Sequence, residues 1–323
     1  MMRPCILGID TSNYTTSLGL VSVEGEVLAN IKRPLPVAEG ERGLRQSDAL
    51  FAHIKNIPSA MEELREQLSD KTVVAVGVSS RPRNIDGSYM PCFLAGVSAA
   101  ESVSAAMGAP LYRFSHQCGH MMAALVSADR LDLLDRPFCA FHVSGGTTDM
   151  LSVSYRDGGF LAERVGGTKD LNAGQVIDRV GVMLGLRFPC GPALEALAAK
   201  NTKKIPHKQL ATDGLSVNLS GLENMATTLY LQTKDAPYVA AFVLDYIGNA
   251  LLRLCEGYRT RYGERPYLFA GGVMSNTQIK EKISRRLGDA ASFAAPALSA
   301  DNAVGIAALA ALAYAKEGGK GWT

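Results

Sequence analysis

Runs of apolar residues along the chain predict a set of strands that occurs twice. The first copy has three predicted strands, at residues 5–9, 17–23 and 27–31. The second copy begins with two predicted strands, at residues 138–143 and 150–155. In both copies a polar turn rich in Gly, Ser or Thr joins the first two strands, at residues 10–16 and 144–149. This repetition indicates a duplicated fold.

Apolar residues at helical spacing fall between and after these strands. Helices are predicted at residues 44–68, 91–107, 173–184, 191–199, 237–262 and 302–316. Further strands are predicted at residues 72–78 and 267–270. Helices that alternate with short buried strands favour the α/β class.

Each polar turn has two interpretations. Small residues let backbone N–H groups and hydroxyls converge on an anion, so two such turns could hold a phosphate chain. Either turn by itself could equally be an ordinary hairpin connection. The repetition favours the phosphate-binding interpretation.

Length and charge limit the classes of protein. The 323 residues are roughly twice the length of a typical domain, which favours two lobes of similar size. The formal net charge is only +2, so no global field marks nucleic acid or a membrane as an obligatory partner. A nucleic-acid substrate would need a local patch. One basic run could contact phosphates or could be a solvated loop, and it contains Lys200, Lys203, Lys204, His207 and Lys208.

The cysteines and the chain start bear on the compartment. Six cysteines without CxxC spacing, mostly in apolar contexts, indicate buried thiols and a reducing compartment. Residues 1–6 lack the features of a secretory signal, and no apolar run approaches the ~20 residues that cross a bilayer. We therefore expect a cytoplasmic protein without a membrane partner.

His116 and His120 are the first candidates for chemistry. Four residues apart on a helix, both imidazoles would lie on one face within reach of a common metal ion. Asp301, at the start of the last predicted helix, could complete the site and leave positions open for substrate. The alternatives are two polar residues on a helix face and an Asp that caps a helix. The pair lacks the glutamate of HExxH, which argues against a metallopeptidase.

Three further positions could contact a nucleotide. The Gly271-Gly272 turn between a strand and a helix lets a planar base approach the backbone, although by itself it is only a turn. Asn276 could bind a base or ribose, or could only cap the next helix. Asp178 could be a ribose ligand or a solvent-facing charge.

Taken together, these segments resemble the TsaD family, which makes threonylcarbamoyladenosine in tRNA and was once described as a glycoprotease family. The resemblance covers nearly the whole chain. It lies in short motifs that occur along this chain in the same order as in the family. They are at residues 6–12, His116 and His120, 143–146, 170–178, 184–186, 191–192, 219–222, 270–273, Asn276 and 301–302.

The resemblance implies a fold and an arrangement of lobes. The implied fold is the duplicated actin-like ATPase fold, related to ribonuclease H, with a central ligand cleft. Lobe I would span residues 1–137, completed by 298–323, and lobe II would span residues 138–297.

The resemblance also implies ligands and partners. His116, His120 and Asp301 correspond to metal ligands, with iron or zinc as the ion, which would polarise the carbonyl of threonylcarbamoyl-adenylate. No catalytic side chain is assigned. The implied partners are tRNA and a TsaB-like actin-fold subunit or a second copy of the chain. A pocket for an adenine nucleotide or acyl-adenylate is implied at His142, Val143, Ser144, Gly145, Gly146, Asp178, Gly191, Gly271, Gly272 and Asn276.

Several positions depart from the family pattern and indicate a divergent member with an altered substrate or partner. The glycine-rich loop of lobe I is replaced by residues 79–84, which carry Arg81 and Arg83. An acidic pair is absent from the first loop, which reads Asn13, Tyr14 and Thr15. The other departures are Thr147 in place of a histidine, and Leu171 and Gln175 in place of acidic residues.

Three functions follow from these observations. The leading hypothesis is metal-dependent transfer of a threonylcarbamoyl group to tRNA adenosine. The second is carbamoyl or phosphoryl transfer to a small molecule, with Arg81 and Arg83 clamping an anionic substrate. The third is a non-catalytic nucleotide-binding subunit, which the loss of the acidic pair at Tyr14 and Thr15 favours.

Overall fold

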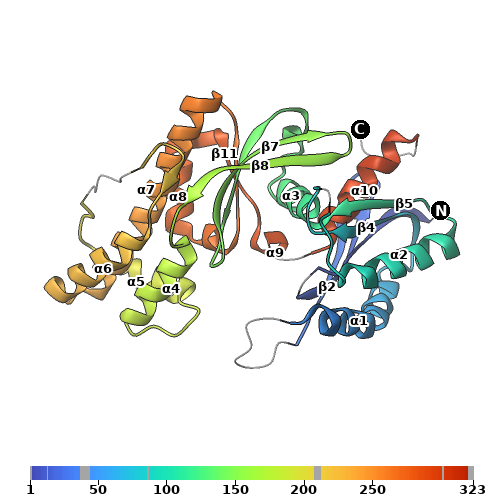
Figure 1. Cartoon of the computed structure of the whole chain (residues 1–323), viewed down its shortest axis with the longest axis horizontal. Helices are drawn as coiled ribbons and strands as arrows, with labels where there is room; N and C mark the ends of the chain where they lie inside the picture. The colour runs from blue at the N-terminus through green and yellow to red at the C-terminus, as the bar shows by residue number, and fades with distance from the viewer. Residues whose placement is uncertain are drawn as a thin grey trace. The chain divides into compact units, whose positions relative to one another are not determined.

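The computed structural model describes residues 2–12, 14–36, 44–85, 87–206, 212–299 and 302–318. The chain divides into two compact units (Figure 1). Unit 1 consists of residues 1–131, 155–161 and 297–323, and unit 2 consists of residues 132–154 and 162–296. The described residues form two sheets, one for each copy of the predicted strand set.

Unit 1 is built on a five-stranded sheet in the order β3-β2-β1-β4-β5. Its strands are β1 (Arg3–Asp10), β2 (Thr15–Ser22), β3 (Val27–Pro34), β4 (Lys71–Arg81) and β5 (Leu111–Ser115). Its helices are α1 (Gln46–Glu66), α2 (Phe93–Met107), α3 (His116–Ser127) and α10 (Val304–Lys316). Strand β1 is antiparallel to β2 and parallel to β4, and it is buried from Cys5 to Asp10, as expected for a central strand covered on both faces.

Unit 2 is built on a six-stranded sheet in the order β11-β10-β6-β7-β8-β9. Its strands are β6 (Phe138–Val143), β7 (Thr148–Arg156), β8 (Gly159–Thr168), β9 (Ser216–Val217), β10 (Tyr267–Ala270) and β11 (Ala291–Phe293). Its helices are α4 (Ala173–Met183), α5 (Gly191–Ala198), α6 (Ser220–Thr233), α7 (Ala236–Tyr262) and α8 (Thr277–Leu287). The short helices of the chain are η1 (Leu131–Asp135), η2 (Gly272–Ser275), η3 (Gly288–Ala290) and α9 (Pro296–Ser299).

The two sheets repeat one topology. Strand β6 is antiparallel to β7 and parallel to β10, as β1 is antiparallel to β2 and parallel to β4. Strand β11 is parallel to β10, as β5 is parallel to β4. Strand β9 extends one edge of the second sheet. The duplicated α/β fold predicted from the sequence is therefore confirmed.

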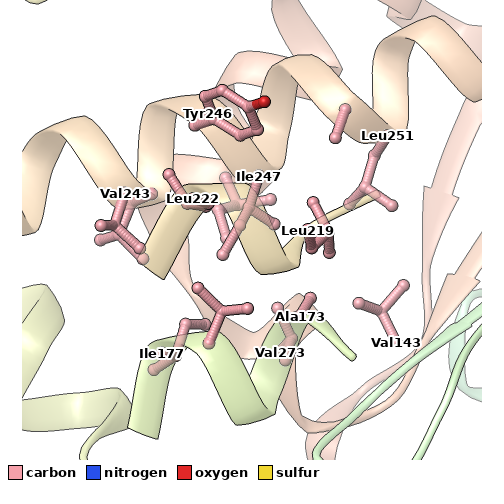
Figure 2. Packing of buried hydrophobic residues seen from close by; sticks show 14 of the residues in the cluster. Val143, Ala173, Ile177, Leu219, Leu222, Val243, Tyr246, Ile247, Leu251 and Val273 are labelled. Atoms are coloured by element: carbon pink, nitrogen blue, oxygen red, sulfur yellow. The ribbon is translucent and has the colours of Figure 1, made fainter. Parts of the chain in front are cut away.

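Helix α7 forms the centre of the unit 2 core. Figure 2 shows Val243 and Ile247 of α7 packed with Ile177 of α4 and Leu222 of α6, all in one buried cluster. This helix is long and apolar enough to cross a membrane by length and composition, but 67% of its most apolar window is buried. Its apolar character is therefore that of a core helix. The six cysteines of the chain are also buried, and none of them forms a disulfide.

Three phenylalanines form an aromatic ladder across the unit 2 sheet. Phe269 of β10 is paired in register with Phe141 of β6 and with Phe293 of β11. The ring centroids are 4.8 Å apart for Phe141 and Phe269, and 5.2 Å apart for Phe269 and Phe293. Such cross-strand aromatic pairs stabilise the sheet and fix its register.

Helix α10 packs on the unit 1 sheet and on α3 at backbone distance. A Cβ added at Gly8 of β1 would lie 2.4 Å from the carbonyl oxygen of Ala303, and one added at Gly77 of β4 would lie 2.8 Å from that of Ile306. A Cβ at Gly305 of α10 would lie 1.9 Å from the carbonyl oxygen of Gly119 in α3. Glycine is required at these positions because nothing larger than hydrogen fits between the backbones.

Gly305→Ala is expected to destabilise the protein by about 1–3 kcal/mol, because the new methyl group overpacks the contact between α10 and α3. In an unhindered helix the same change stabilises by up to about 1 kcal/mol. Urea unfolding measures the difference. The matched control is Gly221→Ala in α6, where nothing lies within 4 Å of the added Cβ. Equal stability of the Gly305 variant and the wild type would contradict the close approach.

Asp170 joins the end of β8 to the start of α6 through its carboxylate. Its carboxylate accepts hydrogen bonds from Leu219 N at 2.7 Å, Ser220 Oγ at 2.5 Å and Leu171 N at 2.6 Å. Burial by itself would raise the pKa of Asp170, but these donors outweigh it and lower the pKa to about 2. A lowered carboxyl pKa stabilises the folded state above the unfolded pKa, and this stabilisation is lost as the pH falls through the folded value.

Asp170→Asn is therefore expected to lower the melting temperature at pH 7 and to reduce the loss of stability between about pH 4 and pH 2. Thermal unfolding measured across that range tests this. Asp157→Asn is the control, since Asp157 is exposed in the turn between β7 and β8. If both variants showed the wild-type pH dependence, Asp170 would not be the acid-sensitive group.

Candidate metal and nucleotide sites

Helix α3 brings the two candidate histidines together in unit 1. The helix starts directly after β5, and its N-cap Ser115 accepts a hydrogen bond from Cys118 N at 3.2 Å. The spacing of four residues places both rings on one helix face, with the two Nε2 atoms 2.9 Å apart and the ring planes at 78°. Two imidazole nitrogens therefore converge on one point.

Asp10 lies behind this pair and was missing from the residues proposed from the sequence. Its Oδ2 is 2.7 Å from His116 Nδ1, and its Oδ1 accepts a hydrogen bond from Ser12 N at 2.7 Å. Burial by itself would raise the pKa of this fully buried carboxyl, but the His116 ring and Ser12 outweigh it, and the pKa of Asp10 is lowered. The signal in the sequence was a charged residue at the end of a continuous apolar strand.

The two histidines supply two nitrogen donors of the kind that protein metal sites use. A carboxylate on Nδ1 keeps the proton on that nitrogen and leaves the lone pair of His116 on Nε2, which faces His120. A histidine oriented by a carboxylate in this way is the usual arrangement around protein-bound metals. Asp301, the third ligand proposed from the sequence, lies outside the described residues. Among the residues that are described, no group of three His, Cys, Asp or Glu side chains is arranged to hold a metal.

Buried hydroxyls surround Asp10 at the same end of the sheet. Ser17 is opposite Asp10 across the β1–β2 pair, and Ser79 follows Val78, the β4 partner of Ile9. Because Gly8, Gly19 and Gly77 face α10, residues two positions away on these strands, namely Asp10, Ser17 and Ser79, face the same way. The Oγ atoms of Ser12, Ser17 and Ser79 are buried without hydrogen-bond partners. Buried hydroxyls without partners at this end of the sheet suit the binding of a polar ligand.

A cavity in unit 2 contains five of the residues proposed for the nucleotide. These are Gly145, Asp178, Gly191, Gly272 and Asn276. The cavity is also lined by residues that were not proposed, namely Gly174, Ile177, Pro189, Pro192, Glu195, Val273 and Ser275. Ile177 and Val273 belong to the buried cluster of unit 2, so the core also forms an apolar wall of the cavity (Figure 2).

Polar groups of this cavity are fixed by hydrogen bonds to the backbone. Asp178 Oδ1 accepts from Cys190 N at 2.8 Å, and Glu195 Oε1 accepts from Thr277 N at 2.7 Å. Asn276 caps α8, since its Oδ1 accepts from Ile279 N at 3.0 Å. Asn276 thus caps a helix, which was the structural alternative considered from the sequence, and it also lines the cavity. Glu195 was missed because a lone glutamate on a short helix carries no distinctive pattern.

The other proposed nucleotide residues do not line this cavity. Val143 belongs to the buried core, and Gly271 packs so closely that an added Cβ would be 2.3 Å from the Val143 carbonyl oxygen. His142, Ser144 and Gly146 lie at or after the end of β6.

The turn after β6 is closed by its own side chains. Ser144 Oγ accepts from Gly146 N at 3.2 Å and from Thr147 N at 3.1 Å. Thr147 Oγ1 lies 2.9 Å from Ser144 Oγ and 2.7 Å from His142 Nδ1. Two of the N–H groups that the sequence suggested for an anion are therefore already bonded within the turn.

The basic run is partly neutralised. Lys203 Nζ is 2.7 Å from Asp235 Oδ2 and 5.7 Å from the centre of the Tyr238 ring. Lys200 and Lys204 are exposed. His207 and Lys208 lie outside the described residues.

Similar structures show the fold. HypF from T. kodakarensis superposes with a TM-score of 0.60 at 14% identity, covering 97% of this chain and 48% of that chain. Component A of the (R)-2-hydroxyglutaryl-CoA dehydratase from Acidaminococcus fermentans gives a TM-score of 0.52 at 16% identity, covering 96% of this chain and 99% of that chain. These proteins have the actin-like ATPase fold, which confirms the fold class expected from the sequence.

Sequence comparison identifies the family. The chain matches the family described as tRNA N6-adenosine threonylcarbamoyltransferase over residues 27–308. Proteins of that name from Streptococcus suis (strain 05ZYH33) and Streptococcus pneumoniae (strain Taiwan19F-14) are each 29% identical to it, over 98% of this chain and 94% of theirs. The chain therefore belongs to the TsaD family of tRNA N6-adenosine threonylcarbamoyltransferases.

Proposed function

We propose that this protein transfers a threonylcarbamoyl group from threonylcarbamoyl-AMP to N6 of adenosine in tRNA, in the cytoplasm and with a bound divalent metal. Membership of the TsaD family supports the reaction class. The observation that carries the metal dependence is the pair of Nε2 atoms 2.9 Å apart, with His116 Nδ1 oriented by Asp10.

The unit 1 residues would hold the metal. His116 and His120 would be ligands through Nε2, with Asp301 as the third ligand and iron or zinc as the ion. A bound ion supplies a Lewis acid that polarises the carbamoyl carbonyl and neutralises charge on the leaving phosphate. Asp10 would act through His116, because its carboxylate fixes the tautomer and the ring orientation.

The unit 2 cavity would hold the adenylate. Asp178 and Glu195 offer carboxylate oxygens to ribose hydroxyls, and Asn276 offers the N–H groups of its amide. Glycine is required at position 174, since an added Cβ would be 2.7 Å from Gly145 N. The apolar wall formed by Ile177 and Val273 suits a base.

The transfer itself requires no nucleophile from the protein. Adenosine N6 would form the new bond to the carbamoyl carbon, the bond from that carbon to the phosphate oxygen would break, and AMP would leave. N6 would release its proton to solvent. The protein would contribute binding, orientation and electrostatic stabilisation of the leaving group.

Nucleoside mass spectrometry tests the proposal. The metal-loaded protein is incubated with threonylcarbamoyl-AMP and unmodified tRNA, alone and with a TsaB-like actin-fold subunit. The expected product is threonylcarbamoyladenosine in the tRNA. Absence of this product in both reactions, with AMP binding intact, would reject the transferase and favour a nucleotide-binding subunit.

His116→Ala is expected to abolish stoichiometric metal binding and tRNA modification together, because it removes one of two converging nitrogens. Asp10→Asn keeps both nitrogens and is expected to weaken metal affinity by about 10–100-fold. Competition with a chelator, followed by elemental analysis, measures both effects. His53→Gln is the control, because His53 lies in α1 and bonds to Thr16 rather than to the pair. Full metal retention in His116→Ala would refute the metal assignment.

Asp178→Ala and Glu195→Ala are each expected to weaken AMP binding by about 10–100-fold, the usual effect of losing a hydrogen bond to a charged group. Titration calorimetry with AMP measures the affinity. Glu163→Ala provides a matched control, since Glu163 is an exposed carboxylate of β8 outside the cavity. Unchanged AMP affinity in both cavity variants would show that the nucleotide binds elsewhere.

A further inference from the structure

Residues 79–84, which are the end of β4 and the loop that follows it, lie against the start of α3, the helix that carries the two histidines. Arg81 is opposite Ser115 in the β4–β5 pair, after a register shift between Ser79 and Arg81. One residue beyond, the carbonyl oxygen of Pro82 accepts a hydrogen bond from Gln117 N at 3.0 Å. The backbone of His116 therefore lies between two contacts with this loop. Because paired strands are about 4.8 Å apart, Arg81 is one strand spacing from the N-cap of α3.

The guanidinium of Arg81 is oriented but not neutralised. Its NH2 donates to Asn84 Oδ1 at 2.6 Å, and its NH1 is 3.3 Å from Ser80 Oγ. Both acceptors are neutral. The side chain is half-buried, and within the described part of the chain no carboxylate lies within ion-pair distance of it. Of its five N–H donors, three remain for another acceptor.

The electrostatic surroundings also favour an anion. The carboxylate of Asp10, at the end of β1, is already engaged by His116 and Ser12. The N-terminus of the 12-residue helix α3 adds positive potential of the same sign. A planar guanidinium held at one edge by two neutral acceptors is suited to bind a carboxylate or phosphate through the other.

We propose that Arg81 binds an anionic group of the substrate, a carboxylate or a phosphate, at the end of β4 next to the start of α3. The inference rests on the proposed function only in treating the histidine pair as the reaction centre. In the proposed donor two groups have this chemistry, namely the threonyl carboxylate and the phosphate that leaves with AMP. A small-molecule substrate with either group would satisfy the same site.

Arg83 provides the internal comparison. It carries the same charge two residues away, but it is exposed, and only its backbone N is fixed, by a hydrogen bond to Ser88 Oγ at 3.0 Å. No ordered acceptor orients its guanidinium among the described residues. Arg81, and not Arg83, is therefore the specific anion-binding residue of this loop.

Titration calorimetry on the full-length, metal-loaded protein tests the proposal with three probes. N-carbamoyl-L-threonine carries the carboxylate, its methyl ester lacks that charge, and inorganic phosphate represents the leaving group. The wild type is expected to bind at least one anionic probe and to bind the ester at least tenfold more weakly. Arg81→Gln is expected to weaken binding of that anion by about 10–100-fold, and Arg83→Gln by less than about threefold.

The outcomes separate the possible ligands. An Arg81 effect on N-carbamoyl-L-threonine alone assigns the site to a carboxylate, and an effect on phosphate alone assigns it to a phosphate. Arg81→Lys keeps the charge without the planar fork, and it is expected to bind with intermediate affinity, which separates loss of recognition from loss of folding. Failure of the wild type to bind either anion would overturn the proposal, as would an Arg81→Gln variant with wild-type affinity.

The same proteins distinguish this inference from the proposed function. A wild type that modifies tRNA while Arg81→Gln binds both anions normally would reject only the role of Arg81. A wild type that binds an anion through Arg81 but leaves tRNA unmodified would reject the tRNA reaction and support a small-molecule substrate.

Discussion

The close approach of helix α10 to the unit 1 sheet and to α3 is the constraint on which the rest of unit 1 depends. Gly8, Gly77 and Gly305 let the α10 backbone sit against strands and helix without intervening side chains. The contact at Gly119 lies between His116 and His120, so the same packing that builds the core also fixes the helix that carries both imidazoles. In unit 1, the packing that stabilises the fold and the placement of the two candidate metal ligands therefore depend on the same contacts.

Much of the fold could be predicted because its central elements are continuously apolar. The strand at 138–143 and the strand at 267–270 have the predicted bounds, and helix α7 starts one residue before its prediction. Duplication was visible because a strand, turn and strand recur with the same composition. Elements with weak patterns were missed. Strand β5 has only two buried positions, and α6 has few buried residues on a largely polar sequence.

The candidate sites were predictable where spacing encodes geometry and not where the partner is distant in sequence. His116 and His120 are four residues apart on one helix, so their proximity follows from the helical repeat. Asp10 is 106 residues away from His116, and only the pairing of β1 with β4, and of β4 with β5, brings them together. The turn after β6 shows the opposite error. Its composition suggested free N–H groups, but the Ser144 hydroxyl accepts two of them, a local competition that composition does not reveal.

The three histidines described in unit 1 show how surroundings rather than residue type separate structure from chemistry. His53 is fully buried, bonds to Thr16 Oγ1 at 2.8 Å, and has a pKa lowered to about 4 by burial, so it stays neutral at physiological pH. His116 is instead held by a carboxylate, which directs its other nitrogen towards His120. A neutral imidazole bonded to a hydroxyl stabilises the packing of α1 on β2. A buried carboxylate that turns one imidazole towards a second imidazole fixes the direction from which a ligand would bind. This difference in surroundings is why we assign chemistry to α3 and not to α1.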